Sequence, residues 1–440
     1  MIKTLTSAFK NKDIRKKLLY TLMMLVVIRI GSLLPIPGVD TEYFSTLLSG
    51  FNSGDLSYLS AFTGGSFEKM SLFALSITPY ITSSIIMQLL TIAIPKLEEM
   101  QKEGEDGRKK IASITRYVTI ALALIESIAM AVGFGRQGLI KDYKDMSTIH
   151  YVTCIIVVVA ALTAGSAVLM WIGERITEKG VGNGISIVLL INIISGMPSD
   201  FVTLYSTFVA NKSIARGVTV AVIIAAIVIA VVVLVVILQD GERRIPVQYS
   251  QKVAGRKTIG GQATNIPLKV NTAGVMPIIF ASSIMQFPVI IVQLFTSNSY
   301  EWTKYLSQSY WCRVQMPKYS IGLLLYIILV VVFAYFYTSI TFNPVQIADN
   351  LKKAGGVVPG ITPGRSTSEY LNKILNYIVF IGAVGLMIVA LIPIMCTGFF
   401  NASVSFGGTS IIIIVGVVLE TLKQIEAQMC NRYYKGFLSE

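Results

Sequence analysis

Long apolar runs alternate with short polar segments along almost the whole chain. Eight runs approach or exceed the roughly 20 residues that a helix needs to cross a bilayer, and they contain few charged residues. They are residues 18–34, 71–94, 117–134, 151–172, 217–238, 272–295, 321–340 and 374–393. Two shorter runs, 185–197 and 410–422, bring the predicted number of membrane-spanning helices to ten.

The composition agrees with this pattern. Of 440 residues, 53% are hydrophobic and 14% are charged, and the mean hydropathy is +0.67, whereas soluble domains carry about a quarter charged residues. The predicted fold class is therefore an all-α integral membrane protein. The sequence lacks the P-loop, H-E-x-x-H and G-x-S-x-G motifs, and its four cysteines are scattered, so we expect no enzyme activity, catalytic residues, cofactor or metal site.

The distribution of cations predicts the orientation. With the N- and C-termini in the cytoplasm and ten spans, the cytoplasmic segments hold 27 Lys and Arg residues and the outer segments hold 9, as the positive-inside rule requires. Residues 1–17 carry six of these cations without a cleavage site after the first apolar run, so this run is predicted to be an uncleaved anchor. Arg29, inside the first span, is interpreted as snorkelling or held in a structural ion pair.

Ten spans divide into two sets of five, and an odd number per set gives the second set the opposite orientation. We therefore expect two inverted five-helix halves, residues 1–210 and 211–440. Pro79 and Pro277 interrupt the second span of each half, and broken spans at corresponding positions indicate a transport path between the halves. Gln88 and Gln286, further along the same two spans, are candidates to cap broken backbone or to form hydrogen bonds between helices.

The predicted path is lined by aliphatic rather than charged residues. An apolar constriction gates by dewetting and selects no particular solute. The candidates are Ile77, Ile81, Ile185, Leu189, Ile279 and Ile413. Glu126, inside the third span, leaves open an alternative, an inverted-repeat secondary transporter of small solutes that uses this carboxylate for coupling.

Two cytoplasmic loops, 239–271 and 341–373, are unusually long for connections between spans. The first contains the basic, glycine-rich stretch GERRIPVQYSQKVAGRKTIGGQ, which predicts a projecting hairpin. This first loop is a candidate docking site for an acidic protein or for ribosomal RNA.

Several stretches closely resemble the SecY family, the pore subunits of the bacterial Sec protein-conducting channel. The matching stretches run in order along almost the whole chain. They are RIGSLLPIPG (29–38), FALSITPYITSSIIMQLL (73–90), KEGEDGRKKI (102–111), GERITEKGVGNGIS (173–186), PLKVNTAGVMP (267–277), FNPVQIADNLKKAGGVVPG (342–360) and FGGTSI (406–411).

This resemblance implies a clamshell of two halves that translocates unfolded secretory polypeptides across the bacterial cytoplasmic membrane and releases apolar segments into lipid. It implies a plug helix at about 56–72 and assigns the six aliphatic residues to a pore ring. The implied plug residues are Leu56, Phe62, Gly64, Gly65 and Phe67, and the implied lateral-gate residues are Pro79, Gln88, Pro277 and Gln286.

The resemblance also implies partners: the small membrane subunits SecE and SecG, the SecA ATPase, the ribosome, signal sequences with their unfolded substrates, and membrane lipid. The implied docking residues are Arg243, Arg244, Arg256, Lys257, Lys352, Lys353 and Arg365. Two positions depart from the family pattern. Thr362 stands where the family has an arginine, and Glu126 stands where an uncharged residue is expected.

Overall fold

The computed structural model describes residues 9–50, 63–135, 140, 147–208, 214–249, 252–254, 257–259, 263–295, 300–313, 316–400 and 408–435. The transmembrane region is built from helices α2 (Lys12–Leu33), α5 (Thr78–Ala93), α7 (Glu105–Phe134), α8 (Thr148–Lys179), α9 (Gly184–Phe208), α10 (Ile214–Asp240), α11 (Met276–Phe295), α13 (Ile321–Thr341), α15 (Arg365–Phe400) and α16 (Gly408–Lys435). Shorter helices are α3 (Thr41–Gly50), α6 (Pro95–Lys102), α12 (Glu301–Leu306) and α14 (Pro344–Lys353), with 3₁₀ turns η2 (Gln308–Tyr310) and η3 (Pro317–Ser320).

Each of the ten predicted spans falls on one of these ten long helices. Within the described residues, five helical stretches are long and apolar enough to cross a membrane by length and composition, and six are if the pair α5–α6, bent by 100°, is one span. The helix α2 carries Lys16, Lys17 and Arg29, and the apolar parts of α9 and α11 are short. Length and composition alone therefore identify five or six membrane-spanning helices among the described residues, fewer than the ten long helices of the fold.

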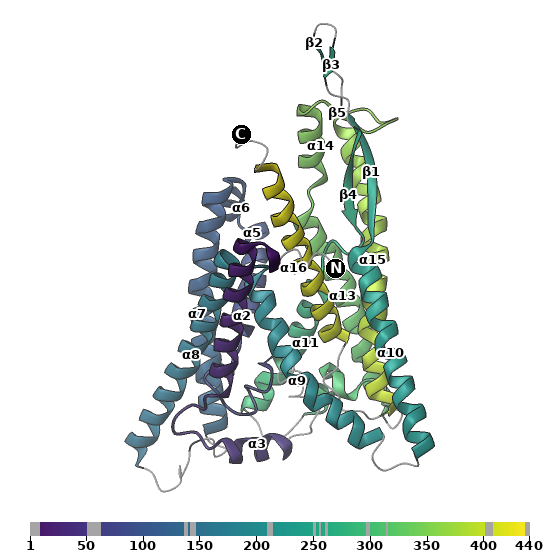
Figure 1. Cartoon of the computed structure of the whole chain (residues 1–440). Helices are drawn as coiled ribbons and strands as arrows, with labels where there is room; N and C mark the ends of the chain where they lie inside the picture. The colour runs from purple at the N-terminus through teal and green to yellow at the C-terminus, as the bar shows by residue number, and fades with distance from the viewer. Residues whose placement is uncertain are drawn as a thin grey trace.

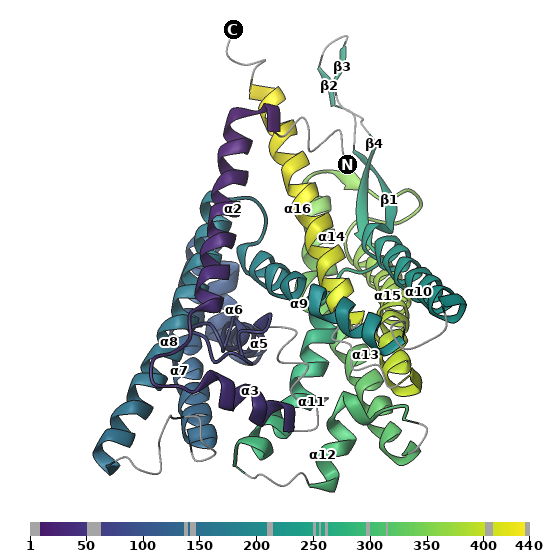
Figure 2. The same ribbon diagram turned by 60° about the horizontal axis from the view of Figure 1, so that its bottom comes forward.

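The long helices form two groups (Figure 1). In one group α7 packs against α5 and α8, and α2 packs against α8; in the other α13 packs against α11 and α15, and α10 packs against α15 and α16. Helices α9 and α16 contact each other and lie between the groups, as Figure 2 shows. A single hydrophobic cluster, which contains Ile77, Leu189, Ile279 and Ile413, joins α5, α9, α11 and α16 there. The core of the protein thus lies between the two groups as well as within each.

The two proline-containing spans begin as helices at their prolines instead of being interrupted by them. Pro79 is the second residue of α5 and Pro277 is the second residue of α11, where a missing N–H leaves no hydrogen bond unmade. The residues before α5, 64–77, form turns, with Ser76 at φ 52°. Ser71 and Ser76 are both fully buried, because irregular backbone at membrane depth must find its hydrogen bonds inside protein.

The two long loops, which are predicted to be cytoplasmic, add β structure that the all-α class does not include. Strand β1 (Glu242–Tyr249) pairs antiparallel with β4 (Ala263–Lys269), and β2 (Lys252–Ala254) pairs with β3 (Lys257–Ile259). The predicted projecting hairpin is confirmed: the strands extend beyond the helices at one end of the molecule, and α3 lies at the opposite end (Figure 1).

The structure also joins the two long loops. Strand β5 (Gly356–Val357), from the second loop, pairs antiparallel with the end of β1, with Gln248 opposite Val357. Val247 and Leu371 are fully buried in a hydrophobic cluster that includes residues of the hairpin, α14 and α15. The two loops therefore fold as one unit, hereafter called the cytoplasmic unit because both loops are predicted to lie in the cytoplasm.

Candidate functional site

All six predicted ring residues lie in or against the hydrophobic cluster that joins α5, α9, α11 and α16, hereafter the central cluster. Ile77, Leu189, Ile279 and Ile413 are buried in it, and Ile81 and Ile185 are half-buried and pack against it. They come from four separate segments of the chain. The structure thus brings together residues that are more than 330 positions apart in sequence.

On α5 and α9, the spacing of the ring residues places each pair on one face of its helix. Ile77 is the N-cap residue of α5, and Ile81 follows one turn later, while Ile185 and Leu189 are likewise four residues apart on α9, so each pair shares a helix face. The described side chains that are buried in the central cluster are all aliphatic or phenyl groups. These side chains can exclude water and pack around a chain of any sequence, but they offer no ligand for an ion.

The central cluster contains residues that were not predicted. Phe280 and Val188 neighbour ring residues in sequence and are buried in the cluster, and Ile28 of α2 is fully buried there. Phe280 stacks edge-on against Phe333 of α13, with ring centroids 5.8 Å apart. No periodic signal separates these positions from lipid-facing apolar ones, so the sequence alone does not identify them.

Of the predicted plug helix at about 56–72, residues 56–62 lie outside the described residues, whereas residues 64–70 and Leu72 form turns and Ser71 forms an isolated bridge with Pro35. Gly64 and Gly65 adopt φ values of +63° and +80°, which favour glycine. Phe67 is buried in an aromatic cluster with Phe44 of α3 and Phe134 of α7 instead of in the central cluster. Leu56 and Phe62 lie outside the described residues.

This turn segment, residues 64–77, is fastened to its surroundings by polar contacts. Asn192 of α9 donates to the hydroxyl of Ser76 at 2.9 Å, and Ser166 of α8 donates to the Ser76 carbonyl at 3.3 Å. Arg29 donates to Ser195 of α9 at 2.8 Å and, within the described residues, forms no ion pair. The intramembrane arginine therefore serves as a hydrogen-bond donor beside the turns.

The two predicted gate helices have little direct contact, and both pack against α7. The side-chain carbonyls of Gln88 on α5 and Gln286 on α11 are buried and have no hydrogen-bond partner among the described residues. A buried, unpaired amide oxygen costs about 1–3 kcal/mol. Glu126 on α7 is half-buried, and nothing in its surroundings explains the carboxylate.

The predicted docking residues that the structure describes lie on the surface of the cytoplasmic unit. Arg243 and Arg244 are exposed on β1, Lys352 and Lys353 are exposed at the end of α14, and Arg365 is the first residue of α15. Arg244 pairs with Glu242 and Arg365 pairs with Glu369. Lys257 lies on β3, and Arg256 lies outside the described residues. Thr362 is exposed, in a turn flanked by Gly360 and Gly364.

Comparison with known proteins decides the family. The SecY family model matches residues 71–422. The chain belongs to the SecY family. It is 41% identical to the protein translocase subunit SecY of Halalkalibacterium halodurans and 42% identical to that of Streptomyces galbus, in both cases over 100% of each chain, and 39% identical to that of Staphylococcus aureus over 99% of each.

Solved structures of channels share the fold. A protein-conducting channel has a TM-score of 0.59 at 18% identity, covering 94% of this chain and 92% of the other. Sec61 in the canine ribosome-channel complex from the endoplasmic reticulum has a TM-score of 0.58 at 17% identity, again covering 94% and 92%. As a SecY protein, the chain is a multi-pass membrane protein and a translocase subunit that forms a protein-conducting channel. The transporter alternative is thereby wrong, and the expectation of a protein without enzyme activity is confirmed by the family.

Proposed function

We propose that this SecY protein passes unfolded secretory polypeptides across the cytoplasmic membrane of a bacterium and releases apolar segments sideways into the lipid, with both its termini in the cytoplasm. One observation carries the proposal. Six aliphatic side chains from four distant segments converge in or against the central cluster between the two groups of helices. A site of this kind suits a cargo of variable sequence, because aliphatic groups pack without forming specific hydrogen bonds.

The ring residues, Ile77, Ile81, Ile185, Leu189, Ile279 and Ile413, close the resting channel. An apolar constriction expels water and so blocks ions. During translocation the same side chains surround the moving chain and limit leakage. The plug, with Leu56, Phe62, Gly64, Gly65 and Phe67 as its proposed residues, seals the ring from the outer side.

The gate opens between α5 and α11 as residues 1–210 and 211–440 separate. A signal sequence can drive this opening only by binding the open state more tightly than the closed one. The side-chain carbonyls of Gln88 and Gln286 are buried without a partner among the described residues, which is costly. Opening gives them access to water or to a polypeptide N–H, which lowers the free energy needed to separate the helices. Pro79 and Pro277 start the two gate helices at matching positions.

The cytoplasmic unit docks the partners that supply the driving force, the SecA ATPase or the ribosome, while SecE and SecG accompany the channel in the membrane. Arg243, Lys352 and Lys353 are exposed and form no ion pair among the described residues, so they are available to carboxylates or phosphates. Lys257, on β3 of the projecting hairpin, and Arg256, which lies outside the described residues, are further proposed docking residues. Two solved relatives of the fold, canine Sec61 and yeast Ssh1, are ribosome-bound complexes.

Site-specific photo-crosslinking tests the proposal. A photoreactive residue at Ile81 should attach to a stalled secretory chain in membrane vesicles, in a signal-sequence-dependent manner. Ile156 of α8, which is 60% exposed and lies outside the central cluster, provides the control and should attach to lipid only. Failure of Ile81 to attach, with the stalled chain demonstrably inserted and with lipid attached at Ile156, would remove the ring from the translocation path.

A further inference from the structure

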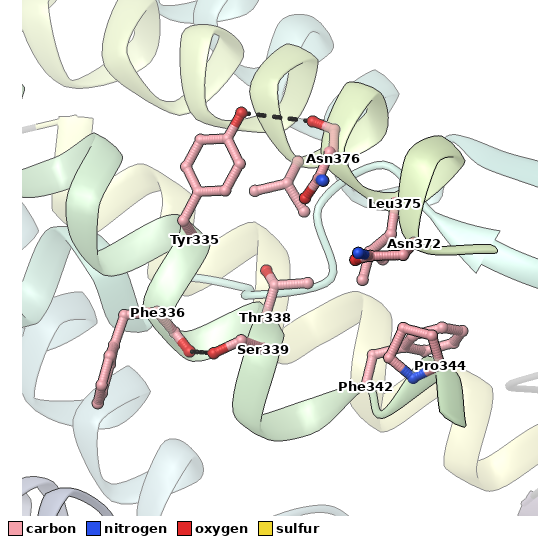
Figure 3. A pocket seen from close by; sticks show the side chains of 10 residues that line it. Tyr335, Phe336, Thr338, Ser339, Phe342, Pro344, Asn372, Leu375 and Asn376 are labelled. Atoms are coloured by element: carbon pink, nitrogen blue, oxygen red, sulfur yellow. Dashed lines mark hydrogen bonds between the residues drawn. The ribbon is translucent and has the colours of Figure 1, made fainter. Parts of the chain in front are cut away.

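A pocket of about 370 Å³ lies between the cytoplasmic end of α13, the start of α14 and the first turns of α15 (Figure 3). It is separate from the central cluster. Tyr335 and Ser339 of α13 line one side, and Asn372, Asn376 and Val379 of α15 line the other. The size lies at the lower end of the range for small-molecule sites.

The α15 wall of the pocket carries two side-chain amides that form no hydrogen bond with the described residues. Asn372 and Asn376 are exposed, lie one helical turn apart on α15, and form no side-chain hydrogen bond with another described residue. The hydroxyl of Tyr335 donates to the backbone carbonyl of Asn376 at 3.4 Å, and the hydroxyl of Ser339 donates to the Phe336 carbonyl at 2.7 Å. The two amide groups therefore remain available to oxygens of a ligand.

The pocket lies where an exposed apolar stripe on α13 ends. This stripe runs the length of α13 with helical spacing, and its members are 37–68% exposed. It consists of Ile321, Leu324, Ile328, Val332 and Tyr335. Ser339 is next along this stripe, and on α15 Asn376 is followed one turn later by Phe380, which is 56% exposed. The amides of Asn372 and Asn376 thus lie where the exposed apolar residues of α13 and α15 end.

This arrangement selects an amphiphile rather than a second protein. A helix with its side chains is about 10–12 Å across, too wide for a pocket of this volume. A headgroup with its glycerol fits, and an acyl chain can continue along Val332 and Tyr335. We infer that the pocket binds one glycerophospholipid from the leaflet on the hairpin side, with Asn372 and Asn376 donating to its phosphodiester and ester oxygens. Because the donors are neutral, phosphatidylethanolamine and phosphatidylglycerol both fit.

The test uses the full chain, purified from membranes with its bound subunits and placed in nanodiscs. The nanodiscs contain phosphatidylethanolamine with a photoreactive diazirine close to the glycerol. After irradiation, adducts are mapped by mass spectrometry. We expect adducts on the segments that contain Tyr335 and Asn376. The double variant Asn372→Leu/Asn376→Leu should lower their yield about fivefold or more, because two hydrogen bonds are lost. The yield on the exposed Ile156 of α8 should not change.

Two further variants sharpen the result. Asn372→Asp/Asn376→Asp should lower the yield at least as much, because a carboxylate repels the phosphate, whereas Asn350→Asp, exposed on α14 and outside the pocket lining, should leave it unchanged. Equal yields in the wild type and both double variants would overturn the inference. It would also be overturned if a photoreactive residue at Tyr335 captured another polypeptide while the lipid gave no adduct there. Neither outcome depends on translocation, so the proposed function is tested separately.

Discussion

The guanidinium of Arg29 on α2 donates a 2.8 Å hydrogen bond to the hydroxyl of Ser195 on α9, and this hydroxyl lies 3.3 Å from the carbonyl of Gly64. Three segments therefore meet at one serine: the first span, the fifth span, and the start of the turn segment that leads into α5. Hydrogen bonds to charged groups contribute about 1.5–3 kcal/mol each. A hydroxyl has one proton, and the carbonyl of Asn192 on α9 accepts it at 2.7 Å. The Arg29–Ser195 bond therefore fastens α2 to α9, on which Leu189 of the ring lies, beside the start of the turn segment.

Removing this contact should loosen the closed channel. Arg29→Leu and Ser195→Ala should each raise the ion leak of reconstituted, idle channels, and the double variant should leak less than the sum of the two effects predicts. A coupling free energy of about 0.5–3 kcal/mol is typical of residues in direct contact. Arg175→Leu, which removes an arginine paired on the surface with Glu178, is the control and should change little. Strictly additive effects on leak would show that the hydrogen bond plays no part in closure.

The glycine pair beside this contact offers a matched comparison. Gly64 and Gly65 both have positive φ, so alanine at either costs about 1–2 kcal/mol in backbone strain. Only at Gly64 would the new methyl group also lie 2.5 Å from the Ser195 hydroxyl, whereas at Gly65 it meets nothing within 4 Å. Gly64→Ala should therefore lower the midpoint of thermal unfolding and raise ion leak more than Gly65→Ala. Equal effects would indicate that backbone strain alone matters.

Much of the architecture follows from local sequence. Apolar runs located all ten long helices, and the basic, glycine-rich stretch after 239 predicted a hairpin. The turns at 64–77 could not be predicted in this way, because buried contacts with α8 and α9, such as Asn192 to Ser76, decide them. The pairing of Gln248 with Val357 is equally non-local. An isoleucine of the ring and one that faces lipid look alike in sequence, so the broken spans suggested the six candidates but only the family resemblance assigned them to a ring.

A polar group in the ring should destabilise the closed state. Ile413 is 1% exposed in the central cluster, and an unpaired amide buried there costs about 1–3 kcal/mol, which shifts the equilibrium toward open by about 5- to 150-fold. Ile413→Asn should raise the ion leak of idle channels and allow export of proteins with defective signal sequences. Ile413→Leu, which conserves volume and polarity, should do neither. If both variants seal as well as the wild type, Ile413 does not contribute to the barrier.

A destabilising substitution in the cytoplasmic unit should unfold both of its loops together. Val247 of β1 is fully buried among side chains of the hairpin, α14 and α15. Val247→Asp buries an unpaired carboxylate and should unfold this unit, since burial of an isolated charge costs several kcal/mol. Binding of the SecA motor or the ribosome should be lost, and protease cleavage should appear in both loops, 239–271 and 341–373, while the idle channel keeps its ion barrier. Gln248→Asp, at the exposed next position, is the control for the added charge. Cleavage restricted to the first loop would show that the β1–β5 pairing does not couple the two.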